Sequence, residues 1–226
     1  MTPPPPPPPP LPPGVPPEHV LAVVAAQRLL PVLRSPDADA AVRRTAALLA
    51  AGCRAVELTT STPGWAEAVR RAVALTDAEG RPPLIGLGTV TEGADAERAL
   101  EAGAAFLVSP CAAAEVRAVA DRRGALFLEG GFTPGEVAAA ARHDGVAKVF
   151  PAHVGGPDYL RTLRAVLPRA RLLPTGGIGL DQVGEWLEAG ALAVGIGSGL
   201  PDDPAELAAV LARFATAGIS TAGVAG

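Results

Sequence analysis

Residues 103–150 read GAAFLVSPCAAAEVRAVADRRGALFLEGGFTPGEVAAAARHDGVAKVF, and this stretch repeats one simple order. A glycine is followed by a short apolar run and then by an Ala-rich segment of helical periodicity. The glycines at positions 103, 124 and 145 define a unit of about 21 residues, enough for one strand and one helix. Glycine commonly ends a helix in the left-handed conformation. The stretch therefore predicts successive β/α units.

The same order continues through the chain from Glu18 onward, and a short helix, His19–Arg28, is expected before the first strand. The expected strands are Leu29–Leu33, Ala55–Leu58, Leu84–Gly88, Phe106–Ser109, Leu126–Glu129, Val146–Phe150, Leu172–Thr175 and Ala193–Ile196. The helices that follow them are expected to begin near Asp37, Gly64, Gly93, Ala113, Thr133, Gly156, Asp181 and Asp203. Helix ends are expected at Gly52, Gly103, Gly124, Gly145 and Gly190.

Eight evenly spaced β/α units predict an α/β fold in which residues 18–226 form a single (β/α)8 TIM barrel. An open, doubly wound sheet is the alternative. Residues 1–17 form a separate segment with an unbroken proline run from Pro3 to Pro10. This composition predicts a disordered polyproline II tail without a core, which could also dock in an aromatic groove of a partner.

Composition excludes several classes of function. The net charge is −4 and no basic run exceeds Arg-Arg, so nucleic-acid binding is not expected. No apolar stretch reaches 18 residues and no signal peptide is evident, so we expect a cytosolic protein without a membrane partner. Cys53 and Cys111 lack metal-ligand spacing and are expected to be reduced thiols. We expect neither a metal nor a cofactor.

Lys148 is the single lysine among 19 basic residues. Arginine would serve equally well as a surface charge, but it cannot lose its proton, so chemistry that needs a neutral amine requires lysine. Lys148 stands among apolar neighbours in Val146–Phe150, and burial disfavours the ammonium form. A neutral amine attacks a ketone and forms an iminium, which acts as an electron sink. The alternative is a structural lysine that is paired with a carboxylate.

Barrel enzymes carry their active sites at the carboxyl ends of the strands, and several polar residues are expected there. Glu57 could relay protons to and from the carbinolamine, or it could only form a salt bridge with Lys148. Thr89 and Arg34 are candidates for binding a substrate carboxylate, although Arg34 could also be a plain surface arginine.

The loops after the seventh and eighth expected strands are rich in glycine, in Pro174–Ile178 and Gly195–Gly199. Phosphate sites of such barrels form in these two loops because backbone N–H groups can approach an anion closely. The candidate phosphate-binding residues are Gly176, Gly177, Gly197 and Ser198, with Thr175 beside them. Tight turns without a ligand are the alternative.

In this order, the segments resemble the 2-keto-3-deoxy-6-phosphogluconate and 4-hydroxy-2-oxoglutarate aldolase family. The resemblance covers about Leu29 to Leu200. It rests on Ala55–Leu58, Gly86–Val90, Val108–Pro110, Thr133–Glu136, Lys148–Pro151 and Pro174–Ile178. Two further segments, Ser61–Trp65 and Gly156–Pro168, are similar to the 6-phosphogalactonate branch.

The resemblance implies a homotrimer of β/α barrels with metal-free Schiff-base chemistry that yields pyruvate and an aldehyde. It places the Schiff-base lysine on Lys148, the proton-relay glutamate on Glu57 and the carboxylate-binding threonine on Thr89. It places phosphate at Gly176-Gly177 and Ser198.

Four positions depart from the family pattern. Ser61 stands where many members have an arginine that holds the keto-acid carboxylate, so Arg34 is expected to substitute. Glu129 stands where proline is usual, which adds a carboxylate near the mouth. Phe132 narrows the space, and His153 is expected to pair with Glu129.

Three functional hypotheses follow. The first is a pyruvate-dependent class I aldolase acting on a 2-keto-3-deoxy-6-phospho sugar acid or on 4-hydroxy-2-oxoglutarate. The second keeps the Schiff base but changes the reaction, for example to a dehydratase, a decarboxylase or an aldolase for an unphosphorylated 2-keto acid. The third is a non-catalytic barrel that binds a phosphometabolite or serves as a scaffold.

Overall fold

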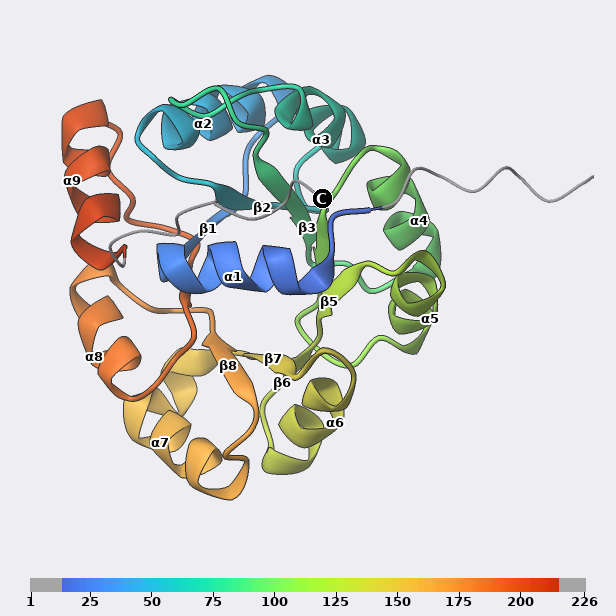
Figure 1. Ribbon diagram of the computed structural model, residues 1–226, viewed down its shortest axis with the longest axis vertical. Coiled ribbons are helices and arrows are strands. Elements are labelled where there is room, and N and C mark those ends of the chain that lie inside the picture. The colour runs from blue at the N-terminus through green and yellow to red at the C-terminus, as the bar shows by residue number, and fades with distance from the viewer. Residues whose placement is uncertain (1–13, 216–226) are drawn as a thin grey trace, which may run out of the picture.

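The computed structural model describes residues 14–215, which form a parallel sheet surrounded by helices (Figure 1). The strands are β1 Leu29–Leu33, β2 Ala55–Thr59, β3 Leu84–Gly88, β4 Phe106–Val108, β5 Leu126–Leu128, β6 Gly130–Gly131, β7 Val146–Val149, β8 Arg171–Pro174 and β9 Val194–Ile196. The α-helices are α1 Pro17–Gln27, α2 Ala38–Ala50, α3 Trp65–Val73, α4 Gly93–Glu101, α5 Ala114–Arg123, α6 Pro134–Asp144, α7 Gly156–Val166, α8 Val183–Glu188 and α9 Pro204–Phe214. Two 3-10 turns are η1 Ala152–Val154 and η2 Leu180–Gln182.

The strands pair in parallel and curl around a common interior. One group has the order β5-β4-β3-β2-β1-β9, and the other has the order β6-β7-β8. A parallel bridge between Thr175 and Gly195 links β8 to β9. On the other side, β5 and β6 are separated by Glu129 alone. The fold is therefore an α/β fold with a curled parallel sheet, as the periodicity predicted.

Side chains alternate between the two faces of the curled sheet, as the period of two in a strand requires. The inner cluster contains one set of alternate strand residues, including Leu30, Ala55, Phe106 and Val146. The neighbouring positions face the surrounding helices and belong to a larger outer cluster. This alternation decides which polar side chains point into the interior.

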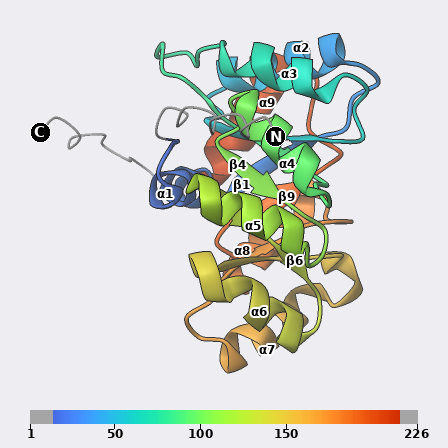
Figure 2. The same cartoon turned by 90° about the vertical axis from the view of Figure 1, so that its right-hand side faces the viewer.

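Helix α1 covers one end of this interior, across the centre of the view in Figure 1 and to one side of the strands in Figure 2. Its apolar side chains, among them Val20 and Val24, pack with the inner cluster. The buried Gln27 amide donates to the carbonyls of Leu29 and Ala55, at 2.7 and 2.9 Å, and accepts from the N–H groups of Arg54 and Ala55. The opposite end of the interior, where the strands have their carboxyl ends, stays available for a site.

The helix limits follow local capping rules. Asp37, Thr133 and Asp203 each accept a hydrogen bond from a backbone N–H in the first helical turn. The five glycines expected at helix ends, Gly52, Gly103, Gly124, Gly145 and Gly190, all have positive φ angles between 63° and 98°. Between residues 14 and 215, no helix is long and apolar enough to cross a membrane.

The limits of several elements differ from expectation by one or two residues, and two of these differences matter here. Helix α1 begins at Pro17, within the segment assigned to the proline-rich tail, because proline fits the first turn of a helix. Residues 1–13 of that tail, and residues 216–226, lie outside the described residues. The expected strand Leu126–Glu129 ends at Leu128, and pairing with the next strand resumes at Gly130.

Candidate functional site

Lys148 lies on β7 in the phase that faces the interior, two residues after the inner-cluster residue Val146. Only 4% of its surface is exposed. Its backbone pairs with Gly130 of β6 and Leu173 of β8, so the lysine is held from both sides. The Nζ atom lies 5.2 Å from the ring centre of Phe150. The site thus contains a buried amine beside an aromatic ring.

Glu57 lies on β2, two residues after the inner-cluster residue Ala55, so its side chain also points into the interior. It is 1% exposed. Burial raises the pKa of its carboxyl, while the positive charges of Lys148 and Arg34 act in the opposite direction. Among the described residues, no hydrogen-bond partner reaches Oε1. Glu57, Lys148 and Arg34 therefore share one electrostatic environment, in which a carboxyl oxygen is free to exchange a proton.

Glycines stand beside the polar side chains of the interior. A Cβ atom on Gly88 would lie 1.8 Å from Oε1 of Glu57, and one on Gly195 would lie 2.3 Å from Oγ1 of Thr175. Neither distance is compatible with a side chain larger than hydrogen. The glycines make room for the functional groups, which accounts for their place inside strands that otherwise favour larger residues.

Thr175 directly follows β8 and is 4% exposed. Its Oγ1 atom is buried and has no hydrogen-bond partner among residues 14–215. A buried hydroxyl without a partner is costly, and a bound ligand or water molecule that completes its hydrogen bonding would remove this cost. Thr175 thus supplies an unused donor and acceptor in the interior.

Thr89 directly follows β3 and adopts a φ angle of 60°, in the left-handed region. This conformation is strained for a β-branched residue and is often found at functional sites. The Thr89 carbonyl accepts a 2.9 Å hydrogen bond from the hydroxyl of Thr60. In the loop after β2, the hydroxyl oxygen of Ser61 lies 2.8 Å from that of Thr59, the last residue of the strand. The loops after β2 and β3 are therefore fixed to each other.

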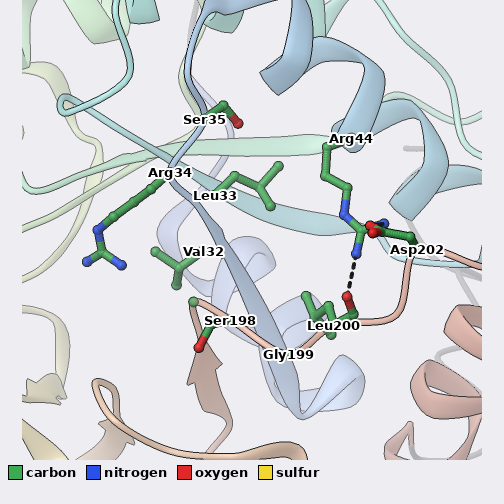
Figure 3. Close-up of a pocket in the computed structure, with 10 residues that line it drawn as sticks. Val32, Leu33, Arg34, Ser35, Arg44, Ser198, Gly199, Leu200 and Asp202 are labelled. Carbon is green, nitrogen blue, oxygen red and sulfur yellow. Dashed lines mark hydrogen bonds and ion pairs between the residues drawn. The ribbon is translucent and has the colours of Figure 1, made fainter.

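Arg34 is the first residue after β1 and lies beside Gly197, since a Cβ built on Gly197 would be 3.0 Å from the Nη1 atom of Arg34. Both residues line a pocket with Ser198, Arg44 and Asp202 (Figure 3). Arg44 is paired with Asp202 at 3.2 Å, whereas Arg34 extends away from that pair. Arg34 was expected to bind the substrate carboxylate, but the structure places it next to the loop expected to bind phosphate.

The Gly176-Gly177 loop, the other expected phosphate element, lies against Phe150 and His153. A Cβ on Gly176 would be 2.8 Å from the Phe150 ring, and one on Gly177 would be 2.4 Å from Nδ1 of His153. Both glycines have positive φ angles, 96° and 71°. The Phe150 ring therefore contacts this loop as well as the lysine.

The expected pairing of Glu129 with His153 is wrong. Glu129 has the outward phase, and its carboxylate accepts from the N–H of Ala113 at 2.9 Å and from Arg117 at 3.4 Å. His153 instead approaches the carbonyl oxygen of Gly176. The second carboxylate thus faces helix α5 and does not add negative charge to the mouth.

Phe132 stacks on Tyr159 of α7, with ring centres 5.0 Å apart, and the Tyr159 hydroxyl donates to the Phe132 carbonyl. Both side chains are partly buried. The contact anchors α7 to the end of β6.

Sequence reasoning missed the roles of three residues. It did not identify Arg117, because nothing in one sequence distinguishes this arginine from the 17 others. It also did not identify Gly88 and Gly195 as the neighbours of Glu57 and Thr175. Their inward phase, which the strand alternation already gives, was the available signal.

Comparisons with known proteins identify the family of the chain. The family model described as KDPG and KHG aldolase matches residues 20–210. The chain is 32% identical over 174 residues to 2-dehydro-3-deoxy-6-phosphogalactonate aldolase of Escherichia coli, covering 76% of this chain and 83% of the relative. It is 36% identical over 164 residues to 2-dehydro-3-deoxy-phosphogluconate aldolase of Pseudomonas aeruginosa, covering 71% and 72%.

A solved structure extends the comparison to the chemistry of a relative. KDPG aldolase from Legionella pneumophila, with pyruvate captured as a covalent carbinolamine, superposes with a TM-score of 0.75 at 25% identity. The alignment covers 87% of this chain and 98% of that one. The chain therefore belongs to the KDPG and KHG aldolase family and is an aldolase.

Proposed function

We propose that the protein is a class I aldolase that forms a Schiff base between Lys148 and a 2-keto acid. Its substrate class is a 2-keto-3-deoxy-6-phospho sugar acid or 4-hydroxy-2-oxoglutarate, which it cleaves reversibly to pyruvate and an aldehyde. The observation that carries the proposal is that Lys148 and Glu57 are both buried on the inner face of one curled sheet. Within the described part of the chain, Oε1 of Glu57 has no hydrogen-bond partner.

The chemistry uses these two groups in sequence. The neutral amine of Lys148 adds to the C2 carbonyl, and loss of water from the carbinolamine gives the iminium. Removal of the C4 hydroxyl proton then breaks the C3–C4 bond, releases the aldehyde and leaves the bond electrons in an enamine. Protonation at C3 and addition of water release pyruvate. We assign the proton transfers to Glu57, because its raised pKa suits a group that must both give and accept a proton.

We assign the two ends of the substrate to opposite sides of the lysine. Thr89 and Ser61, on the loops after β3 and β2, bind the keto-acid carboxylate. A distal phosphate lies against Gly176, Gly177, Gly197 and Ser198, where backbone N–H groups approach an anion without steric hindrance. The place of Arg34 beside Gly197 favours a contact with this distal phosphate over the expected contact with the carboxylate. Thr175 offers its hydroxyl to a substrate hydroxyl between the two ends.

The same proposal covers the assembly and the limits of the domain. The bridge from β8 to β9 and the short interruption at Glu129 favour a closed (β/α)8 barrel over an open sheet. By resemblance to the family we also propose a homotrimer in the cytosol, whose barrel domain begins with α1 at Pro17, after the proline-rich segment. Light scattering after size-exclusion chromatography tests the oligomeric state, and a monomer would contradict it.

Borohydride trapping with pyruvate tests the Schiff base directly. Because Lys148 is the single lysine, the competing amine is the N-terminal one, and peptide mass spectrometry separates the two. We expect a reduced pyruvate adduct on Lys148 in the wild type and none at this position in Lys148→Met, a variant of similar shape without an amine. A folded wild type that gives no adduct with excess pyruvate would overturn the proposal.

A substrate panel then separates the proposed function from its alternatives. We expect cleavage of the phosphorylated sugar acid to exceed cleavage of the same compound without phosphate. Adduct formation without cleavage of either compound would instead favour a Schiff-base lyase or dehydratase for another 2-keto acid. Binding of the phosphorylated compound without any adduct would favour a non-catalytic binding barrel.

A further inference from the structure

His153 has no part in the chemistry described above, yet its ring lies directly against the loop assigned to phosphate. It belongs to η1, which follows the lysine strand β7. Its backbone N–H donates to the carbonyl of Gly176 at 3.1 Å. Its Nδ1 atom lies 3.2 Å from the same oxygen. Since a carbonyl oxygen can only accept, Nδ1 carries the proton in this contact.

These two bonds set the direction of one peptide group. The carbonyl of Gly176 and the N–H of Gly177 belong to the same planar peptide, in which the two bonds point in opposite directions. Holding the carbonyl against His153 therefore directs the Gly177 N–H to the side away from the imidazole. A donor held in a fixed direction binds an anion without further ordering of the loop.

The packing around the loop supports a positioning role for the imidazole. A Cβ atom on Gly177 would lie 2.4 Å from Nδ1 and 2.5 Å from Cγ of His153, so the ring fits against an unsubstituted α-carbon. Phe150 contacts the preceding glycine, Gly176, in a similar way. The loop is thus supported by an aromatic ring at one glycine and by a histidine at the next.

We propose that His153 is a positioning residue that orients the Gly176–Gly177 peptide and thereby favours substrates with a distal phosphate. The inference rests on the proposed function, because it assumes that this loop binds the phosphate. It assigns His153 no contact with the reacting carbon atoms. Loss of the imidazole therefore weakens recognition of the phosphate more than it slows carbon–carbon cleavage. The backbone bond from His153 to Gly176 remains in any variant, which limits the size of the effect.

Steady-state kinetics of His153→Ala test the proposal with a matched pair of substrates, the phosphorylated sugar acid and the same acid without phosphate. Loss of one hydrogen bond predicts a rise in KM of about five- to tenfold for the phosphorylated compound. The rise for the unphosphorylated compound is expected to be smaller, and kcat is expected to change less than KM. Inorganic phosphate, used as a competitive inhibitor, is expected to bind more weakly in the same proportion.

Two further variants make the outcome decisive. His153→Asn keeps a short side-chain donor and is expected to recover most of the lost affinity for phosphate. His143→Ala is the control, because His143 lies at the end of α6, near Asp121, and is expected to match the wild type. Equal changes for both substrates, unchanged phosphate inhibition in His153→Ala, or no recovery in His153→Asn would overturn the proposal. These outcomes are distinguishable from a failure of the proposed function itself, in which the wild type would form no pyruvate adduct at Lys148.

Discussion

The carboxylate of Glu57 lies against the α-carbon of Gly88, so that a methyl group on this glycine would fall 1.8 Å from Oε1 and 2.5 Å from Cδ. The two residues belong to neighbouring strands, β2 and β3. The contact fixes the position of a carboxyl whose Oε1 has no hydrogen-bond partner among residues 14–215. Packing against a glycine, rather than hydrogen bonding, thus holds the proposed proton relay in place.

Gly88→Ala is therefore expected to displace Glu57 and to reduce turnover. General acid–base catalysis contributes about a hundredfold or more, so the loss in kcat is expected to be of that order. Cleavage kinetics of the phosphorylated sugar acid measure this loss, and thermal melting reports whether the fold survives. Gly135→Ala is the matched control, because a Cβ atom at Gly135 would meet no atom of the described residues within 4 Å. Turnover of Gly88→Ala within twofold of this control would contradict the assigned role of Glu57.

The stability of Glu57→Gln is expected to depend on pH in a direction set by the raised pKa of the wild-type carboxyl. Burial raises this pKa above its unfolded value of 4.5, so ionised Glu57 destabilises the folded state. This destabilisation is absent below pH 4.5 and grows as the pH rises through the pKa that Glu57 has in the folded state. Glutamine cannot ionise, so the variant is not destabilised in this way. We therefore expect Glu57→Gln to be more stable than wild type near neutral pH.

Urea unfolding at a series of pH values measures this difference. The two unfolding free energies are expected to converge as the pH falls toward 4.5. In the variant, Lys148 loses its attraction to the Glu57 carboxylate. The pKa of Glu57 is nevertheless raised, so the desolvation of this carboxyl outweighs the attraction to Lys148. If Glu57→Gln were less stable than wild type at neutral pH, and this difference disappeared in acid, the pKa of Glu57 would be lowered and the prediction would be wrong.

Much of the fold was predictable from the sequence, because local rules agree with one another. The strands β1 and β3 have the expected limits, because each apolar run is flanked by polar or proline residues. Helix starts follow from the capping residues Asp37, Thr133 and Asp203. The inward placement of Lys148 follows from its phase relative to the apolar residues of its own strand.

The environment of the site was less predictable, because it depends on contacts between distant segments. The partner expected for Glu129 was wrong, since no local rule fixes which side chain reaches a carboxylate from another helix. For Glu129, the alternation of side chains along the strand predicts the correct, outward direction. It shares the outward phase of Phe127, and both contact Arg117 from helix α5.

The two cysteines are expected to differ sharply in reactivity. Cys53 is buried, donates to the Ala55 carbonyl at 3.1 Å, and burial raises its pKa to about 12. Cys111 is exposed. Because the thiolate is the reactive form, a disulfide reagent at pH 8 is expected to modify Cys111 rapidly and Cys53 only after unfolding. Cys111→Ser should abolish the rapid phase. A rapid phase that survives in this variant would contradict the burial of Cys53.

Arg117 is the centre of a buried ionic cluster outside the curled sheet. It is 8% exposed, lies 2.8 Å from Asp144 and 3.4 Å from Glu129, and stacks on the Phe127 ring at 4.6 Å. Glu129 in turn accepts, through its carbonyl, the backbone N–H of Lys148 at 3.0 Å. The cluster therefore supports the segment that pairs with the lysine strand.

Arg117→Met is expected to destabilise the fold by about 3–5 kcal/mol, because it leaves two largely buried carboxylates without their cation. Arg122→Met, on the same helix, is the control. Arg122 is paired with Glu97 but its side chain is 58% exposed, so its loss is expected to cost about 1 kcal/mol or less. Denaturant unfolding measures both values. Similar losses in the two variants would show that the buried cluster contributes no more than a surface pair. A large loss in Arg117→Met alone would show that the carboxylate at Glu129, which departs from the family pattern, depends on its arginine.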